Sequence, residues 1–292
     1  MVRNLWITFL VGLMLPGACS ASSITYTKVR VGRTVGHVVT ADLTNREVRV
    51  SVALAKGGTG SQEAFKSIIG RARPAAAITG TFFDTRTLIP TGDIAVFGTI
   101  VHSGCVGAAL CIDSSNAPKM VPLRAGRQCK WTGYETVLCA GPTLISRGRI
   151  NISLKREGFR RSLCAPARRT AVGITKSGKL LVVAINRSAS LHDLARLMLK
   201  LNARDAVCLD GGSSTAFYYQ GRYLATPGRR LTNCLVIYSS SSKYNSAKGA
   251  IAPARYFATA PSGLVSFRLS DLLTKAPAAA EAVIMRSSRQ PR

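Results

Sequence analysis

Acidic residues are scarce in this chain. Its 292 residues include 13 Asp and Glu against 40 Lys and Arg, which gives a formal net charge of +27. This balance favours polyanionic surroundings such as nucleic acid, anionic glycans, phosphate-bearing polymers or acidic membrane surfaces. The scarcity argues against a multi-carboxylate cage for a hard cation. It also makes each acidic residue within a tight motif a stronger catalytic candidate.

Histidine is scarce too, and the cysteines lack metal-binding spacing. The chain has three scattered histidines and no Cys-x-x-Cys pair, so we expect no zinc site and assign no metal or other cofactor. Two cysteine pairs are close enough in sequence to staple hairpins, and we expect disulfides in this exported chain. These pairs are Cys105 with Cys111 and Cys129 with Cys139.

No apolar run after the N-terminus is long enough to span a bilayer. Residues 1–21 are typical of an export signal, with Arg3, an apolar run at 5–15 and small residues at 16–21. The sequence predicts export to the periplasm or the extracellular space. Residues 15–19 also resemble a lipoprotein box, so a lipid anchor at Cys19 and peripheral membrane association are the alternative.

Hydrophobic residues make up 47% of the chain and charged residues 18%, which is enough for a sizeable core. We expect one main domain at 22–238, followed by a basic, largely disordered tail at 239–292. The basic segment 146–169 is either a solvated loop or a clamp for an anionic polymer.

The best-defined pattern lies in residues 171–219. An apolar strand at 180–185 precedes a capping box at Ser190 and Asp193, a helix with one apolar face, and a second buried strand at 206–209. A strand, a helix and a strand predict a parallel pair with a right-handed crossover. We therefore expect a mixed α/β or α+β fold, with a parallel βαβ unit in a mixed sheet and packed helices.

The C-terminal ends of parallel strands share one sheet edge, where ligands tend to bind. Arg187 follows the first strand and Asp210 follows the second. The motif after Asp210 consists of Gly211, Gly212, Ser213 and Ser214, and it could form an anion-binding nest. Each feature alone is more typical of a turn or a surface charge. Their convergence on one edge predicts a carboxylate beside a phosphate site.

Several motifs together resemble the phosphodiester glycosidase family. They occur in order over about residues 26–238, at positions 78–84, 90–92, 139–142, 169–174, 180–187, 206–214 and 230–237. The sequence departs from the family pattern twice. Thr79 stands where the family has Asn, and Ile185-Asn186-Arg187 replaces Asp-Gly-Arg. These departures leave open an altered substrate or a weakened activity.

The resemblance implies an exported hydrolase that cleaves the glycosidic bond of a sugar-1-phosphodiester, in an exopolysaccharide or a cell-envelope glycan. Such a reaction needs a carboxylate beside the sugar carbon. We assign this role to Asp210, with Asp84 and Asp93 as second candidates. Asp84 has an alternative role in ordering its loop, and Asp93 in capping a turn. The leaving phosphate needs charge stabilisation. The substrate- and phosphate-binding candidates are Thr79, Arg169, Arg187, Gly211, Gly212, Ser213 and Ser214.

Two other functions compete with hydrolysis. The basic segment and the Thr79 change favour a non-catalytic binding protein for anionic polysaccharide. Nucleic-acid binding is suggested by charge alone, and the export signal and the lack of a recognisable reading motif argue against it. We therefore expect an anionic or phosphate-linked glycan as the partner and no nucleic acid.

Overall fold

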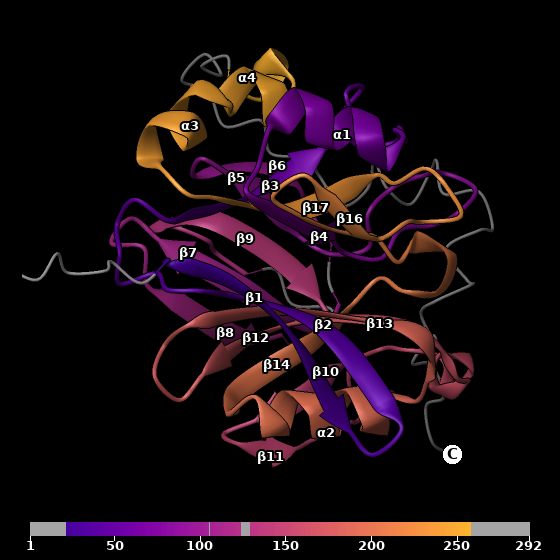
Figure 1. Cartoon of the computed structure of the whole chain (residues 1–292). Coiled ribbons are helices and arrows are strands. Elements are labelled where there is room, and N and C mark those ends of the chain that lie inside the picture. The colour runs from indigo at the N-terminus through magenta and orange to yellow at the C-terminus, as the bar shows by residue number, and fades with distance from the viewer. Residues whose placement is uncertain (1–21, 105, 124–128, 258–292) are drawn as a thin grey trace, which may run out of the picture.

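Three antiparallel β-sheets form the body of the protein, and short helices cover their outer faces (Figure 1). The computed structural model describes residues 22–104, 106–123 and 129–257. The expected export signal, Cys105 and residues 258–292 lie outside the described residues. Within the described part of the chain, no helix is long and apolar enough to cross a membrane.

The first sheet has seven strands and carries most of the sequence-predicted site. Hairpin β1–β2 forms one side of it, and short strand β11 forms the other edge. In sheet order its strands are β1 (Ile24–Val31), β2 (Thr34–Ala41), β13 (Leu180–Ala189), β12 (Ala167–Thr175), β14 (Ala203–Leu209), β10 (Thr143–Ser146) and β11 (Arg149–Ile150).

The second and third sheets have five strands each. The second runs β16 (Arg222–Ala225), β15 (Phe217–Tyr219), β4 (Ala76–Thr79), β17 (Asn233–Tyr238) and β3 (Arg49–Leu54). The third runs β6 (Thr99–His102), β5 (Ile94–Val96), β9 (Tyr134–Ala140), β7 (Ala108–Asp113) and β8 (Pro118–Pro122).

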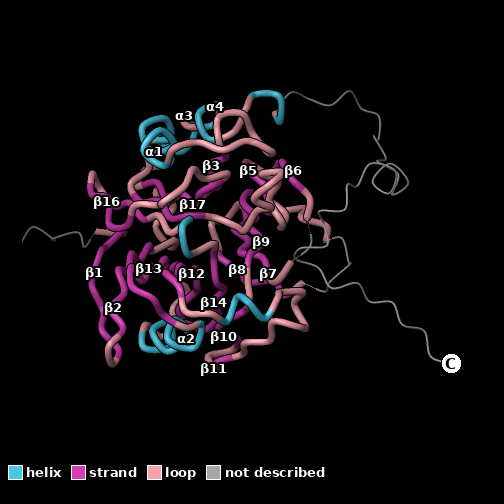
Figure 2. Tube along the Cα trace, turned by 90° about the vertical axis from the view of Figure 1, so that its right-hand side faces the viewer, coloured by secondary structure: helices cyan, strands magenta, loops and turns pink. Residues whose placement is uncertain are grey.

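Helices lie on opposite sides of the sheets. Figure 2 shows α1 (Phe65–Ala72), α3 (Ser241–Ser246) and α4 (Lys248–Ile251) on one side, and α2 (Leu191–Lys200) on the other. Three short 3₁₀ turns occur at Arg161–Cys164, Gly212–Ser214 and Ala254–Tyr256. The predicted capping box of α2 is confirmed. Ser190 Oγ accepts from the Asp193 N–H at 3.1 Å, and Asp193 Oδ2 accepts from the Ser190 N–H at 3.0 Å.

The alternation of apolar residues along the first sheet gives it two buried faces. One face, with Val182, joins a large core shared with the other two sheets. The opposite face, with Leu181 and Val183, packs on α2 through Leu194 and Met198. Burial on both faces explains why its central strands are continuously apolar.

The predicted parallel pair is wrong. β12 lies between β13 and β14 and is antiparallel to both, with Ala171 opposite Val183 on one side and Cys208 on the other. The fold is therefore built of antiparallel sheets and has no adjacent parallel βαβ unit. The pattern of an apolar strand, a helix and a second apolar strand indicates only that β13 and β14 run in the same direction. It does not indicate which strand lies beside each of them, and β12, which is equally apolar, lies between them. Because β12 is antiparallel to both β13 and β14, these two strands run in the same direction, and their C-terminal ends still lie at the same edge of the sheet.

β4 ends at Thr79, within the motif at 78–84, and the chain then turns at Gly80 with a bend at Thr81 and an isolated β-bridge between Phe83 and Pro90. One segment boundary differs from the sequence interpretation. The chain remains folded beyond residue 238, where a tail was expected, because α3 and α4 pack on the sheet through Tyr244 and Ile251, which are 2% and 0% exposed.

The expected hairpin staples are not seen at the two of these cysteines that lie in described strands. Cys111 and Cys139, one from each expected pair, are thiols buried within β7 and β9. Burial raises the pKa of the Cys111 thiol to about 12, so both behave as small apolar core groups.

Candidate active site

Asp210 lies at the point where the first and second sheets meet. It follows β14, and its backbone N–H donates to the Gly80 carbonyl at 3.0 Å. Gly80 follows β4 of the second sheet, and its own N–H donates to the Asn233 carbonyl at 3.2 Å. The Thr170 hydroxyl of β12 donates to the Asp210 carbonyl. The main chain of Asp210 is thus fixed by residues from both sheets.

The Gly80 turn is fixed by the side chain of Asn233. Its Oδ1 accepts from the Thr81 N–H at 2.8 Å, and its Nδ2 donates to the Thr81 carbonyl at 3.4 Å. A Cβ at position 80 would stand 1.8 Å from Asn233 Oδ1, so this close approach requires glycine. The sequence analysis did not select Asn233, because within the motif at 230–237 it only opens an apolar strand and shows no sign of a role at the site.

The carboxyl group of Asp210 is largely removed from water. The Gly211 N–H donates to its Oδ1 at 2.9 Å, and the Ser214 side chain also forms a hydrogen bond with it. Desolvation raises the pKa of Asp210 to about 6, although these two hydrogen bonds and the charge of Arg229 oppose the rise. A carboxyl group that titrates near neutral pH is suited to general acid or base catalysis.

The cation that acts on Asp210 is Arg229, which the sequence analysis did not select. Arg229 is exposed, and its guanidinium carbon lies 5.1 Å from the centre of the Phe83 ring. Its loop is held beside the site because the Gly228 N–H donates to the Ser213 carbonyl at 2.8 Å. A loop arginine in a basic chain gives no sequence signal, so only the fold reveals it.

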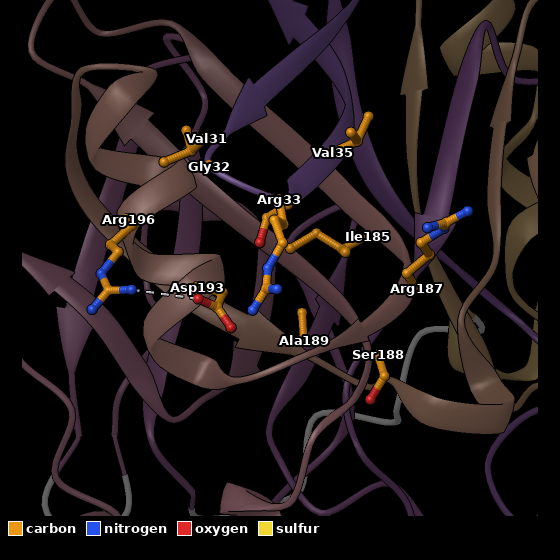
Figure 3. A pocket seen from close by; sticks show the side chains of 11 residues that line it. Val31, Gly32, Arg33, Val35, Ile185, Arg187, Ser188, Ala189, Asp193 and Arg196 are labelled. Atoms are coloured by element: carbon orange, nitrogen blue, oxygen red, sulfur yellow. Dashed lines mark ion pairs between the residues drawn. The ribbon is translucent and has the colours of Figure 1, made fainter.

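Arg187, the predicted phosphate ligand, lines a different cavity. This cavity has a volume of about 440 Å³ and is also lined by Arg33 and Arg196. Figure 3 shows the Arg187 side chain pointing away from Asp193, which pairs with Arg196 at 3.5 Å. Arg187 is not among the charges that shift the pKa of Asp210. Among the described residues, no hydrogen bond or ion pair joins the side chains of Arg187 and Asp210.

Arg169 holds a surface segment in place. Its side chain is buried, with Nε donating to the Ala189 carbonyl at 3.1 Å and Nη2 to the carbonyls of Leu163, at 2.9 Å, and Ala165. We call residues 152–165 the flap. Because three carbonyls occupy its guanidinium, Arg169 ties the flap to the first sheet.

The Gly211-to-Ser214 motif is a tight turn beside Asp210. A Cβ on Gly211 would stand 2.7 Å from the Arg168 carbonyl, and Gly212 has a φ of +58°, so both positions favour glycine. The N–H groups of Gly211 and Ser214 are engaged within the segment, by Asp210 and by the Gly211 carbonyl. Ser213 is exposed while Ser214 is buried, so Ser213 offers the accessible hydroxyl of the pair.

The other predicted acids have structural partners. Asp84 Oδ1 accepts from the N–H groups of Arg86 and Thr87, both at 2.8 Å, and these bonds lower the pKa of Asp84. This arrangement orders the loop after Phe83. Asp93 is buried and accepts from the Gly104 N–H at 2.5 Å and from the Trp131 indole at 2.6 Å. Asp84 thus accepts two hydrogen bonds on Oδ1, and Asp93 accepts one on each carboxylate oxygen.

Thr79 and two other threonines near the candidate active site, Thr81 and Thr215, are buried. Thr79 is 2% exposed in β4, and its N–H donates to the Ala216 carbonyl at 3.1 Å. The hydroxyls of Thr81 and Thr215 are buried without a hydrogen-bond partner. Among the described residues, no group of three or more His, Cys, Asp or Glu side chains is placed to hold a metal ion.

Comparison with known proteins identifies the family. The phosphodiester glycosidase family model matches residues 72–238, which is more than half of the chain. This chain belongs to the phosphodiester glycosidase family, as its sequence motifs predicted. No curated protein sequence matches it.

Solved structures share the fold. The catalytic domain of zebrafish N-acetylglucosamine-1-phosphodiester alpha-N-acetylglucosaminidase, auto-inhibited by its pro-peptide, is similar with a TM-score of 0.62 at 22% identity, over 76% of this chain and 85% of that one. A hypothetical protein from Synechocystis has a TM-score of 0.57 at 16% identity, over 73% of this chain and 61% of that one. At these identities the likeness concerns the fold.

Proposed function

We propose that this chain hydrolyses the glycosidic bond of a sugar-1-phosphodiester, with Asp210 as the catalytic carboxylate. The observation that supports this is the setting of Asp210. Its carboxyl group is desolvated, oriented by Gly211 and Ser214, and influenced by the exposed cation Arg229. Family membership supports a phosphodiester-linked sugar as the substrate.

The proposed reaction breaks the bond between the sugar anomeric carbon and the phosphate oxygen. The phosphate monoester leaves with the electron pair, and an oxygen of water ends on the sugar carbon. Positive charge develops on the sugar in the transition state, and a nearby carboxylate stabilises it. Asp210 either attacks the anomeric carbon or accepts the proton of the attacking water, and both roles require its ionised form.

The leaving phosphate needs a cation more than a proton. Arg229 is exposed beside Asp210, and a guanidinium matches the geometry of phosphate oxygens. The exposed Ser213 hydroxyl adds a donor on the same side of the turn. In this arrangement Asp210 acts at the sugar and Arg229 at the phosphate, so the two groups act at opposite ends of the broken bond.

We also propose that the protein is exported to the periplasm or the extracellular space, where it acts on an exopolysaccharide or a cell-envelope glycan. The signal-like residues 1–21 and the net charge of +27 support this location and an anionic partner. Attachment of lipid at Cys19 would add a membrane anchor.

The test is turnover of a panel of sugar-1-phosphodiesters, followed as release of the phosphate monoester. Wild-type protein should hydrolyse at least one member, and Asp210→Asn should remove most of that activity. Asp205→Asn is the matched control, because Asp205 lies on the same strand and pairs with Arg204 at 2.7 Å, away from Asp210. Full activity in Asp210→Asn would overturn the assignment. Binding of an anionic glycan without turnover of any member would instead support the non-catalytic alternative.

A further inference from the structure

An apolar groove runs between the flap and the first turn of α2. It has a volume of about 770 Å³, within the usual range of ligand sites. Ile152, Leu154 and Phe159 line it with apolar surface, and Lys155, Arg161 and His192 also line it with basic groups. The groove therefore combines an apolar floor with a basic rim.

The floor of the groove is held by packing. Phe159 is 8% exposed, and its ring centre lies 5.8 Å from that of Phe82. Ile152 and Leu154 rest on the core that supports α2. The guanidinium of Arg169 fixes the carbonyls at the end of the flap. A ligand would thus meet a largely preformed surface, which lowers the entropic cost of binding.

Two consecutive phenylalanines contact a residue of the groove and a residue of the candidate active site. Phe159 packs on Phe82, the next residue is Phe83, and Arg229 lies over the Phe83 ring at 5.1 Å. Arg229 is the cation that acts on Asp210. The two phenylalanines therefore link the apolar floor to the place proposed for the phosphate.

The charge of the groove favours an anionic ligand. Lys155 and Arg161 are exposed at its rim. The one acidic residue of the flap, Glu157, is turned into the protein, where it accepts from the Thr143 N–H at 2.8 Å. A purely polar glycan would leave the apolar floor unused, whereas an anionic amphiphile complements both the floor and the rim.

We propose that the alcohol half of the phosphodiester substrate is a hydrocarbon chain that lies in this groove, so that the substrate class is a sugar linked through phosphate to a lipid. This rests on the proposed function. The phosphate lies toward Arg229, the chain extends over Phe82 onto Ile152, Leu154 and Phe159, and Lys155 and Arg161 attract the anionic head during approach. Each buried methylene improves affinity by roughly fourfold.

The first experiment measures kcat/KM for sugar-1-phosphodiesters that carry methyl, butyl and octyl alcohols. The value should rise with chain length, by about 60-fold from methyl to octyl if three more methylenes are buried. Leu154→Asp should abolish this rise, because it places a charge on the apolar floor. Ile100→Asp is the matched control, because Ile100 is an exposed apolar residue of β6 in the third sheet. No dependence on chain length in the wild type would overturn the proposal.

A second experiment separates the groove from the proposed hydrolysis. Octyl phosphate and butyl phosphate, both below micelle-forming concentrations, are titrated calorimetrically into wild type, Asp210→Asn and Leu154→Asp. Tighter binding of the octyl ester by the first two proteins, but not by Leu154→Asp, supports the groove even if no sugar-1-phosphodiester is turned over. Equal affinity of wild type for the two esters contradicts it, whatever the activity. Should Leu154→Asp fail to fold, the wild-type comparison still decides.

Discussion

The backbone N–H of Asp210 donates to the carbonyl of Gly80, and this 3.0 Å hydrogen bond joins the end of a first-sheet strand to the turn that follows a second-sheet strand. The position of the candidate catalytic carboxylate therefore depends on the docking of two sheets. Substitutions around Asp210 should therefore change both the stability of the fold and the rate of the reaction.

Asp210 should lower the stability of the fold above pH 6. Its pKa is about 6 in the folded protein against 3.8 ordinarily, so the folded state binds the proton more tightly than the unfolded state does. The free energy of unfolding therefore falls as pH rises from about 4 to 6, by up to about 3 kcal/mol. Asp210→Asn should be more stable than wild type by about 1–2 kcal/mol at pH 8 and equal to it near pH 4. Urea unfolding at both pH values checks this, and a variant less stable at pH 8 would refute it.

The same titration should appear in catalysis. Because Asp210 acts in its ionised form, kcat/KM should rise with pH through about 6 and then level.

Arg229→Ala should lower kcat/KM by about 100-fold. It should also move the acidic limb to higher pH, because Arg229 now lowers the pKa of Asp210. Arg187→Ala should leave that limb in place. A pH–rate profile for each variant is the measurement. A shift of the acidic limb in Arg187→Ala and not in Arg229→Ala would instead indicate Arg187 as the phosphate ligand.

Asn233→Ala should disturb both structure and rate. It leaves the buried Thr81 N–H without its acceptor, which costs about 1–3 kcal/mol. It also loosens the Gly80 turn that fixes Asp210, so kcat should fall more than KM rises. Asn245→Ala, at an exposed position of α3, is the control and should change neither quantity. Thermal unfolding and steady-state kinetics together test this, and an unchanged kcat would show that the turn does not position Asp210.

Two truncations should behave differently. A chain that ends at residue 257 keeps α3 and α4, with the buried side chains of Tyr244 and Ile251. A chain that ends at residue 240 loses both, and burial of side chains of this size contributes about 1.5–3 kcal/mol each. The longer chain should unfold at the wild-type temperature and the shorter one well below it. Equal melting temperatures would mean that the two helices add nothing to the fold.

Local patterns in the sequence predicted local structure well. Ser190, Asp193 and the apolar face of α2 were identified because a capping box and helical spacing are contained within ten residues. The strands beside β13 and β14 were not identified, because the sequence of an apolar strand does not specify the strand it pairs with. β12 is equally apolar and pairs with both. The family itself followed from the order of several motifs, none of which decides the matter alone.

The candidate site was predicted in part, for a similar reason. Asp210 and its glycines were found because they form one continuous motif, and the structure does place them together. Arg229 and Asn233 come from a loop and a strand that meet Asp210 only through the tertiary fold. Asp84 has the loop-ordering role that the sequence left open, and nothing before the structure distinguished Arg187 from Arg229 as the cation beside Asp210.

The indole of Trp131, buried and bonded to Asp93, gives the protein an optical probe of its own. The only other tryptophan is Trp6, within the signal-like segment. A chain processed after residue 21 would therefore emit from a single indole, which lies just before β9 of the third sheet and is bonded to Asp93. Its emission wavelength would follow the opening of that sheet separately from the two sheets that hold Asp210, without any label being introduced.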